Sequence, residues 1–172
     1  MEPAFTTIDA RFWRMLSIRW QRQPLSGAGA AIQGGRWNSK GMAALYLSAD
    51  HPTAVAEFHQ DLVRPGTLAA YHVTSAAIVD LTDPATIARY GAPETLWFGE
   101  WRRIVAIDKA VPASWHLAEA LLGVGADGVL VPSARQPGGV NLVLWRWSET
   151  AGDGAGVTLI DPNGDLASPR LA

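Results

Sequence analysis

A short glycine-rich segment, GGRWNSKG at residues 34–41, holds an arginine, a tryptophan and an asparagine where an ordinary turn needs none of them. Glycine lets a backbone approach an anionic ligand closely, and the planar guanidinium of Arg36 matches phosphate oxygens in a bidentate manner. Arg14 is a second arginine in an apolar stretch, where a charge requires a partner. The two arginines favour a ligand that carries a pyrophosphate. They equally fit surface ion pairs, with Trp37 as the anchor of the loop.

Three further side chains have positions that suit chemistry. Tyr46 lies in the apolar stretch after the loop, and its ring has the shape to stack on a flat heteroaromatic group. Glu57 directly precedes Phe58 and lies three residues after Ala54, so its carboxylate borders a buried helical stripe and can bind a sugar hydroxyl or stabilise a cation. Ser133 ends an apolar strand, where functional residues tend to collect. A core tyrosine, a surface glutamate and a turn serine are the alternatives.

Several common sites are excluded by their motifs. The chain has neither the G-x-G-x-x-G pattern after a strand nor the G-x-x-x-x-G-K-[ST] pattern, so Rossmann and P-loop sites are not expected. No G-x-S-x-G elbow surrounds Ser133, which argues against a hydrolase nucleophile. The four histidines lack metal-binding spacing, and the chain has no cysteine, so we expect no metal site and no disulfide.

The elements that must position these residues alternate along the chain. Strands are predicted over residues 11–20, 42–49, 67–80, 127–133, 139–147 and 157–161. Helices are predicted over residues 50–63, 83–91, 92–107 and 112–126. Two of these helices have clear starts, with Asp50 and Asp83 as N-caps and a proline in the first turn. Residues 22–41 are predicted to be loop, and residues 148–172 a linker, a last strand and a tail.

The buried stripe of the 50–63 helix is predicted from helical spacing as Ala54, Val55, Phe58 and Leu62. The 112–126 helix is expected to end at Gly123 or Gly125. This order of elements predicts an α+β fold, a single mixed domain over residues 1–172 with a strand-rich core.

Composition narrows the class of protein. The 172 residues fit one domain, and 17% of them are charged, fewer than the roughly 25% of an average soluble domain. A surface so poor in charge favours a partner that covers part of it. The formal charge of -2 argues against direct binding of nucleic acid. The lack of cysteine, of a signal peptide and of a long apolar run predicts a cytoplasmic protein with no membrane association.

Taken in order, the segments FWRML, PLSGAGAAIQGGRWNSKG, AALYLSADHPTAVAEFH and VLVPSARQPGGVNLVLW resemble the RES domain, a family named for its arginine, glutamate and serine. The resemblance covers residues 12–145. It implies a fold similar to that of ADP-ribosyltransferases and a toxin of a type II toxin–antitoxin system that consumes NAD.

The resemblance also implies the site residues. Carried over by position, the catalytic residues are Glu57, Arg36 and Ser133. The residues that bind NAD, the substrate, are Arg14, Arg36, Tyr46, Trp37, Asn38, Ser133 and Asn141. The chain departs from many relatives after Asn141, where LVLWRW replaces a stretch with asparagine, proline and histidine. This change is expected to reshape the acceptor side of the pocket.

Cleavage of the bond between nicotinamide and ribose passes through an oxocarbenium-like state, which a carboxylate such as Glu57 stabilises. Transfer of ADP-ribose to a target protein is the expected outcome, with NAD hydrolysis or phosphorolysis as the alternative. A binding module without catalysis is a remote alternative. The expected partners are a cognate antitoxin and a protein acceptor, and a homodimer within the toxin–antitoxin complex is compatible with them.

Overall fold

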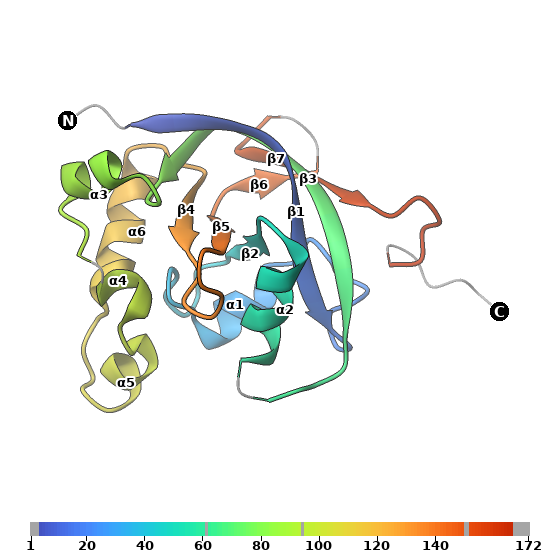
Figure 1. The fold of residues 1–172 in the computed structure, drawn as a ribbon, viewed down its shortest axis with the longest axis horizontal. Coiled ribbons are helices and arrows are strands. Elements are labelled where there is room, and N and C mark those ends of the chain that lie inside the picture. Colours follow the sequence, from blue (N-terminus) through green and yellow to red (C-terminus); the bar gives the residue numbers. More distant parts are fainter. Residues whose placement is uncertain (1–3, 61, 94, 150–151, 167–172) are drawn as a thin grey trace.

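The computed structural model describes residues 4–60, 62–93, 95–149 and 152–166, and within them strands and helices alternate as an α+β fold (Figure 1). The strands are β1 Phe5–Ser17, β2 Leu45–Ser48, β3 Gly66–Asp80, β4 Gly128–Pro132, β5 Val140–Leu144, β6 Trp147–Ser148 and β7 Ala155–Ile160. The helices are α1 Ala28–Gln33, α2 His51–His59, α3 Pro84–Tyr90, α4 Thr95–Phe98, α5 Trp101–Ala106 and α6 Ala113–Gly123. The predicted fold class, with its strand-rich core, is confirmed.

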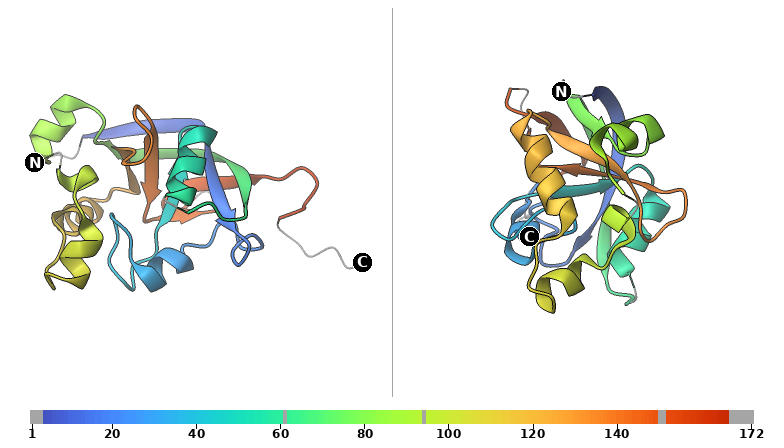
Figure 2. Two further views of the ribbon diagram at one scale, coloured as in Figure 1. Left: turned by 60° about the horizontal axis from the view of Figure 1, so that its bottom comes forward. Right: turned by 90° about the vertical axis from the view of Figure 1, so that its left-hand side faces the viewer.

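The strands form one sheet in the order β1-β2-β5-β4-β3-β7-β6, and β1 also pairs with β3. The pairings β1-β2-β5-β4-β3-β1 therefore close into a ring. The two long strands β1 and β3 run antiparallel along nearly their whole length, from Phe5 opposite Val79 to Ser17 opposite Gly66. In Figure 1 they extend across the top and down the right of the molecule, while α3 to α6 lie on the left, and Figure 2 shows these helices grouped in the same way.

The central strands carry a different core on each face, because successive side chains of a strand point to opposite sides. On β2, Leu45 and Leu47 pack in one cluster with Phe12 and Tyr71. The intervening Tyr46 packs against the other cluster, which α3, α4 and α6 share with the sheet. β5 follows the same rule, with Leu142 and Leu144 in the first cluster and Val143 in the second. The second face is therefore the one that meets the loop at residues 34–37.

Local capping fixes the starts of two helices as predicted. The Asp50 carboxylate accepts a hydrogen bond from the Thr53 amide at 2.7 Å, and Asp83 accepts one from the Thr86 amide at 2.9 Å. The end of α2 was predicted too late. The helix stops at His59, and Leu62 is 77% exposed, so Leu62 does not belong to the buried stripe.

Two other expectations need correction. The segment 22–41 is not all loop, because α1 forms within it, where alanines follow Gly27 and its carbonyl accepts from the Ala31 amide. The predicted helix over residues 92–107 is two short helices, α4 and α5. A Cβ at Gly99 would collide with the Thr95 carbonyl, which accepts the Gly99 amide as α4 ends.

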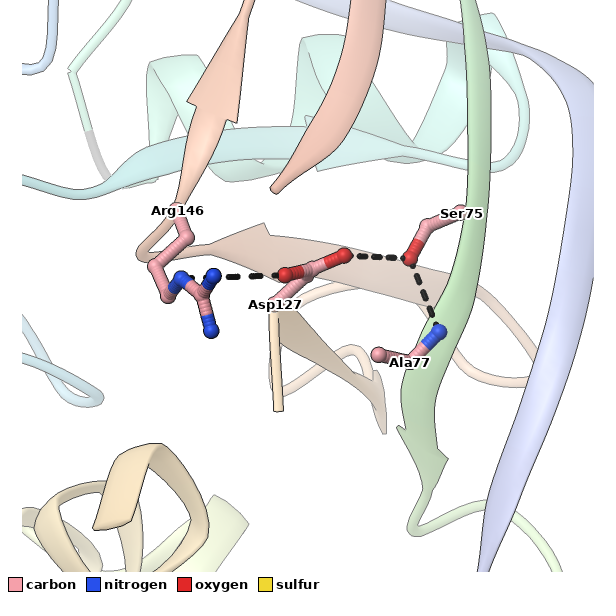
Figure 3. A network of polar contacts seen from close by, with 4 residues as sticks. All are labelled: Ser75, Ala77, Asp127 and Arg146. Atoms are coloured by element: carbon pink, nitrogen blue, oxygen red, sulfur yellow. Dashed lines mark hydrogen bonds and ion pairs between the residues drawn. The ribbon is translucent and has the colours of Figure 1, made fainter. Parts of the chain in front are cut away.

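The strand predicted over residues 139–147 is too long, because β5 ends at Leu144. The buried Asp127 explains this end. The Asp127 carbonyl accepts the amides of both Trp145 and Arg146, which turns the chain after Leu144. Its carboxylate accepts the Ser75 hydroxyl at 2.8 Å and lies 3.9 Å from the Arg146 guanidinium (Figure 3). The Ser75 hydroxyl in turn accepts the Ala77 amide at 3.0 Å. This network joins β3, β4 and the end of β5.

The C-terminal segment holds more structure than a linker and tail. β6 and β7 pair in parallel, and β7 adds to β3 along residues 70–74. The predicted last strand is confirmed, with an earlier start. Residues 150–151 of the predicted linker and 167–172 of the predicted tail lie outside the described residues. No helix of the described part is long and apolar enough to cross a membrane.

Candidate active site

A cavity of about 310 Å³ opens on the second face of the central strands. Its walls come from β1, β2, β4, β5, α2, the loop at residues 34–37 and the start of α5. Six of the predicted site residues line it: Arg14, Arg36, Trp37, Tyr46, Glu57 and Asn141. The volume lies at the lower end of the range for small-molecule sites. Residues that are up to 127 positions apart in sequence thus border one space.

Glu57 is held by two hydrogen bonds on the same oxygen. Ser133 Oγ and Asn141 Nδ2 each donate to Glu57 Oε1 at 2.7 Å. Asn141 is oriented from its other side, because its Oδ1 accepts the Ser48 hydroxyl at 2.8 Å. The sheet register explains this meeting, since Asn141 on β5 stands opposite Ser48 on β2. A carboxylate held by two donors is fixed in position at the cavity wall.

Ser133 forms hydrogen bonds both with the Glu57 carboxylate and with the backbone of the loop that follows β4. Its hydroxyl accepts the amides of Arg135 and Gln136 at 3.1 and 3.0 Å while it donates to Glu57. Ser133 is buried and does not line the cavity, although its neighbours Pro132 and Ala134 do. Its influence on a ligand therefore passes through Glu57.

Tyr46 and the GGRWN motif form one buried unit. The Tyr46 hydroxyl donates to Asn38 Oδ1 at 2.7 Å and accepts the Trp37 amide at 3.0 Å. Burial raises the pKa of Tyr46 far above its usual value, so the phenol stays neutral. A Cβ at Gly35 would overlap the Tyr46 hydroxyl, which explains the glycine at this position.

Asn38 and Trp37 build the loop more than they offer groups to a ligand. Asn38 is fully buried, and its Nδ2 donates to the carbonyls of Ala30, Ser39 and Met42. Trp37 borders the cavity, yet it is only 2% exposed and belongs to the core. The structure therefore assigns both residues to the support of the loop.

The two arginines approach the cavity from different sides. Arg36 Nη1 donates to the carbonyls of Gly99 at 2.6 Å and Leu96 at 3.4 Å, at the end of α4. Burial lowers the pKa of Arg36, and the negative charge of Glu57 opposes that shift. Arg36 and Glu57 thus share one electrostatic environment.

Arg14 is held by the segment before α1. Its Nη1 donates to the carbonyls of Pro24 at 3.1 Å and Ser26 at 3.2 Å. Burial lowers the pKa of Arg14, and the nearby Tyr71 opposes the shift. Because side chains alternate along β1, Arg14 lies on the same side as Phe12 and Leu16, next to Tyr71.

A second hollow, of about 450 Å³, adjoins the cavity, and the two share Arg36, Trp101, Arg102, Ala134 and Arg135. Four arginines line this hollow: Arg36, Arg102, Arg103 and Arg135. Phe98, which is 58% exposed, stands beside them. The last three arginines and Ser48 were not predicted, because their positions in sequence gave no sign that they meet the GGRWN loop. Glu100 lines the same hollow and lies 4.0 Å from the Arg103 guanidinium, so the arginines of the hollow outnumber this carboxylate.

The chain is similar in sequence and in fold to known proteins. The profile of the RES domain family matches residues 11–166. The protein named Toxin Res from Yersinia enterocolitica is 29% identical over 138 residues, which cover 77% of this chain and 81% of that relative. A chain of the crystal structure of the M. tuberculosis MbcT-MbcA toxin–antitoxin complex matches with a TM-score of 0.62 at 21% identity. That match covers 95% of this chain and 91% of the other, and it shows a shared fold.

Proposed function

Because the chain belongs to the RES domain family, we propose that it is the toxin of a type II toxin–antitoxin system and an enzyme that acts on NAD. In this proposal it cleaves the bond between nicotinamide and ribose and transfers ADP-ribose to a target protein, which inhibits bacterial growth. The observation that carries the proposal is the position of Glu57, oriented by Ser133 and Asn141 in the cavity that Arg14 and Arg36 also line.

The chemistry follows from these groups. The C–N glycosidic bond breaks, its electron pair leaves with nicotinamide, and positive charge grows on the ribose ring. Glu57 stabilises that charge from the cavity wall. A nucleophile from the acceptor then bonds to the anomeric carbon and loses its proton. The proposal requires no metal.

The other residues bind and orient the substrate. Arg14 and Arg36 bind the pyrophosphate with the donors that their carbonyl partners leave unused. The Tyr46 ring lies beside the nicotinamide, while Asn38 and Trp37 hold the tyrosine and its loop. Ser133 and Asn141 keep Glu57 in place, so their role is to position the carboxylate.

A cognate antitoxin is the proposed partner. The match to a chain of a toxin–antitoxin complex supports it, as does the exposed apolar surface near the cavity. Phe98 stands exposed at the arginine-lined hollow, and Leu62 is exposed just before Arg64, which borders the cavity. An antitoxin that covers this surface would bury apolar area and block entry of NAD.

Hydrolysis or phosphorolysis of NAD is the second candidate. The hollow lined by Arg36, Arg102, Arg103 and Arg135 favours phosphorolysis, because guanidinium groups suit a small anion such as phosphate as the acceptor and outnumber Glu100, the carboxylate that lies 4.0 Å from Arg103. Each outcome follows the same bond cleavage and differs only in the nucleophile.

Mass spectrometry separates the outcomes. Purified protein is incubated with NAD⁺, with and without phosphate and with and without cell lysate. A protein that gains the mass of one ADP-ribose supports transfer. Free ADP-ribose supports hydrolysis, and ADP-ribose 1″-phosphate supports phosphorolysis. Wild-type protein that releases no nicotinamide under any of these conditions would refute the proposed enzyme.

The same proposal is tested in cells. The variant Glu57→Ala, expressed with and without the antitoxin, should lose growth inhibition and still bind the antitoxin. A variant that remains fully toxic would favour a module that acts by binding alone.

A further inference from the structure

Three consecutive carbonyls of the loop that carries Arg36 are each bound by a side chain from a distant part of the chain. Trp115 Nε1 donates to the Gly35 carbonyl at 2.8 Å. Ser114 Oγ donates to the Arg36 carbonyl at 2.6 Å. Trp145 Nε1 donates to the Trp37 carbonyl at 2.8 Å. The donors are 78 to 108 positions away from their acceptors in sequence.

These donors belong to rigid parts of the fold. Ser114 and Trp115 lie in the first turn of α6, and Ser114 is buried. Trp145 directly follows β5 and is also buried, and the Asp127 carbonyl accepts its amide. The donors therefore hold the loop in a frame that the sheet and α6 define.

Both the backbone carbonyl and the guanidinium of Arg36 are therefore held by hydrogen bonds. The first turn of α6 binds its backbone carbonyl, while the last carbonyls of α4 bind its guanidinium. The segment from α4 to the start of α6 thus surrounds this one residue.

The loop needs such support because of its glycines. Gly34 has a φ of +74°, a conformation that side chains disfavour, and Gly35 follows it. Two adjacent glycines leave a backbone with many accessible conformations. Fixing the carbonyls on either side of Arg36 removes that freedom before a ligand arrives, and a ligand then loses less entropy on binding.

We infer that Ser114, Trp115 and Trp145 are positioning residues for Arg36, which they hold ready for the anionic part of the substrate. The inference rests on the proposed function in that it takes NAD as the ligand of Arg36. It adds a role for α6 and for the tryptophan after β5, both of which lie outside the residues that touch the cavity.

A double-mutant cycle tests the inference. Ser114→Ala removes one donor and a single heavy atom, whereas Trp115→Phe removes one donor together with part of the indole ring. Each is combined with Arg36→Ala. We expect each single variant to lower kcat/KM for NAD⁺ cleavage about three- to tenfold, mainly through KM, since one hydrogen bond is lost. In the Arg36→Ala background the same substitutions should change kcat/KM less than twofold. An equal decrease in both backgrounds would mean that the residues only stabilise the fold.

A control variant, and a measurement that does not depend on activity, separate positioning of Arg36 from a general loss of stability. Thr86→Ala also removes a hydroxyl from the first turn of a helix, α3, far from the cavity, and should leave KM unchanged. Hydrogen exchange of the Trp37 amide needs no turnover, and it should become faster in Trp115→Phe and not in Thr86→Ala. Unchanged exchange in Trp115→Phe would overturn the inference, whereas a wild-type protein inactive on NAD⁺ would overturn only the proposed function.

Discussion

The substitution Glu57→Gln removes the negative charge from the candidate active site and preserves its shape. The amide oxygen of glutamine still accepts the Ser133 hydroxyl and the Asn141 amide, which now donate to Glu57 Oε1 at 2.7 Å. We therefore expect the melting temperature to change little. The bonds become neutral hydrogen bonds, which are roughly half as strong as those to a carboxylate.

The expected loss of activity follows from the charge. Two opposite unit charges about 4 Å apart attract by about 4 kcal/mol at an effective dielectric constant of about 20. Because each 1.36 kcal/mol changes a rate about tenfold, loss of this attraction in the transition state slows NAD⁺ cleavage about a thousandfold. The effect should appear in kcat more than in KM, since the charge on the ribose exists only as the bond breaks.

The assay measures free nicotinamide released from NAD⁺ by purified protein, together with thermal melting. Glu119→Gln is the matched control, because it makes the same chemical change on the exposed face of α6. It should cleave NAD⁺ at the wild-type rate. A folded Glu57→Gln protein that stays within threefold of wild type would refute the electrostatic role of the carboxylate.

Three further predictions follow from other parts of the structure. Gly35→Ala places a methyl group against the Tyr46 hydroxyl and Asn38, so it should destabilise the fold by about 1–3 kcal/mol in chemical denaturation, whereas Gly123→Ala, with open space around it, should not. Burial raises the pKa of Tyr71 to about 12, so its contribution to stability is fully present below about pH 10 and is lost as the pH rises towards 12. Tyr71 should therefore contribute up to about 2.7 kcal/mol to the fall in unfolding free energy over this range, in addition to the contribution of Tyr46, and a Tyr71→Phe protein with the same fall as the wild type would contradict this. Asp127→Ala leaves the Ser75 hydroxyl and Arg146 without their partner and should lower the unfolding free energy by about 1–3 kcal/mol; the exposed Asp153→Ala serves as control, and equal melting of the two proteins would rule out the role of the network.

Local signals in the sequence predicted much of the fold. Asp50 and Asp83 were identified as N-caps because a cap depends only on the next three residues, and the structure confirms both. The helix ends were less predictable. The exposed Leu62 fits the helical spacing of α2, although the helix stops before it. Such ends depend on the tertiary contacts of the chain that follows.

The site residues likewise fall into those that stand out in the sequence and those that only the fold brings together. The glycine loop and its arginine stand out in the sequence by composition, whereas Glu57, Ser133 and Asn141 came together only through resemblance to a family. Their side chains meet because β5 pairs with both β2 and β4, a register that no local pattern encodes. Arg102 and Arg135 were not predicted for the same reason, since they approach Arg36 only in the folded chain.

The chain has eight tryptophans, a residue type that commonly fills a core or an interface. Three of them also use the indole N–H to bind carbonyls of residues 25–37, at Leu25, Gly35 and Trp37. Composition alone does not separate a tryptophan that fills space from one that anchors a loop.

The central place of β5 between β2 and β4 has a consequence for synthesis of the protein in the cell. β5 supplies Asn141 and is made after all the other elements that border the cavity. A growing chain that has not yet reached residue 144 lacks both the strand that joins β2 to β4 and the tryptophan that follows it. The cavity is therefore complete only after nearly the whole domain, apart from its last strands, has been synthesised.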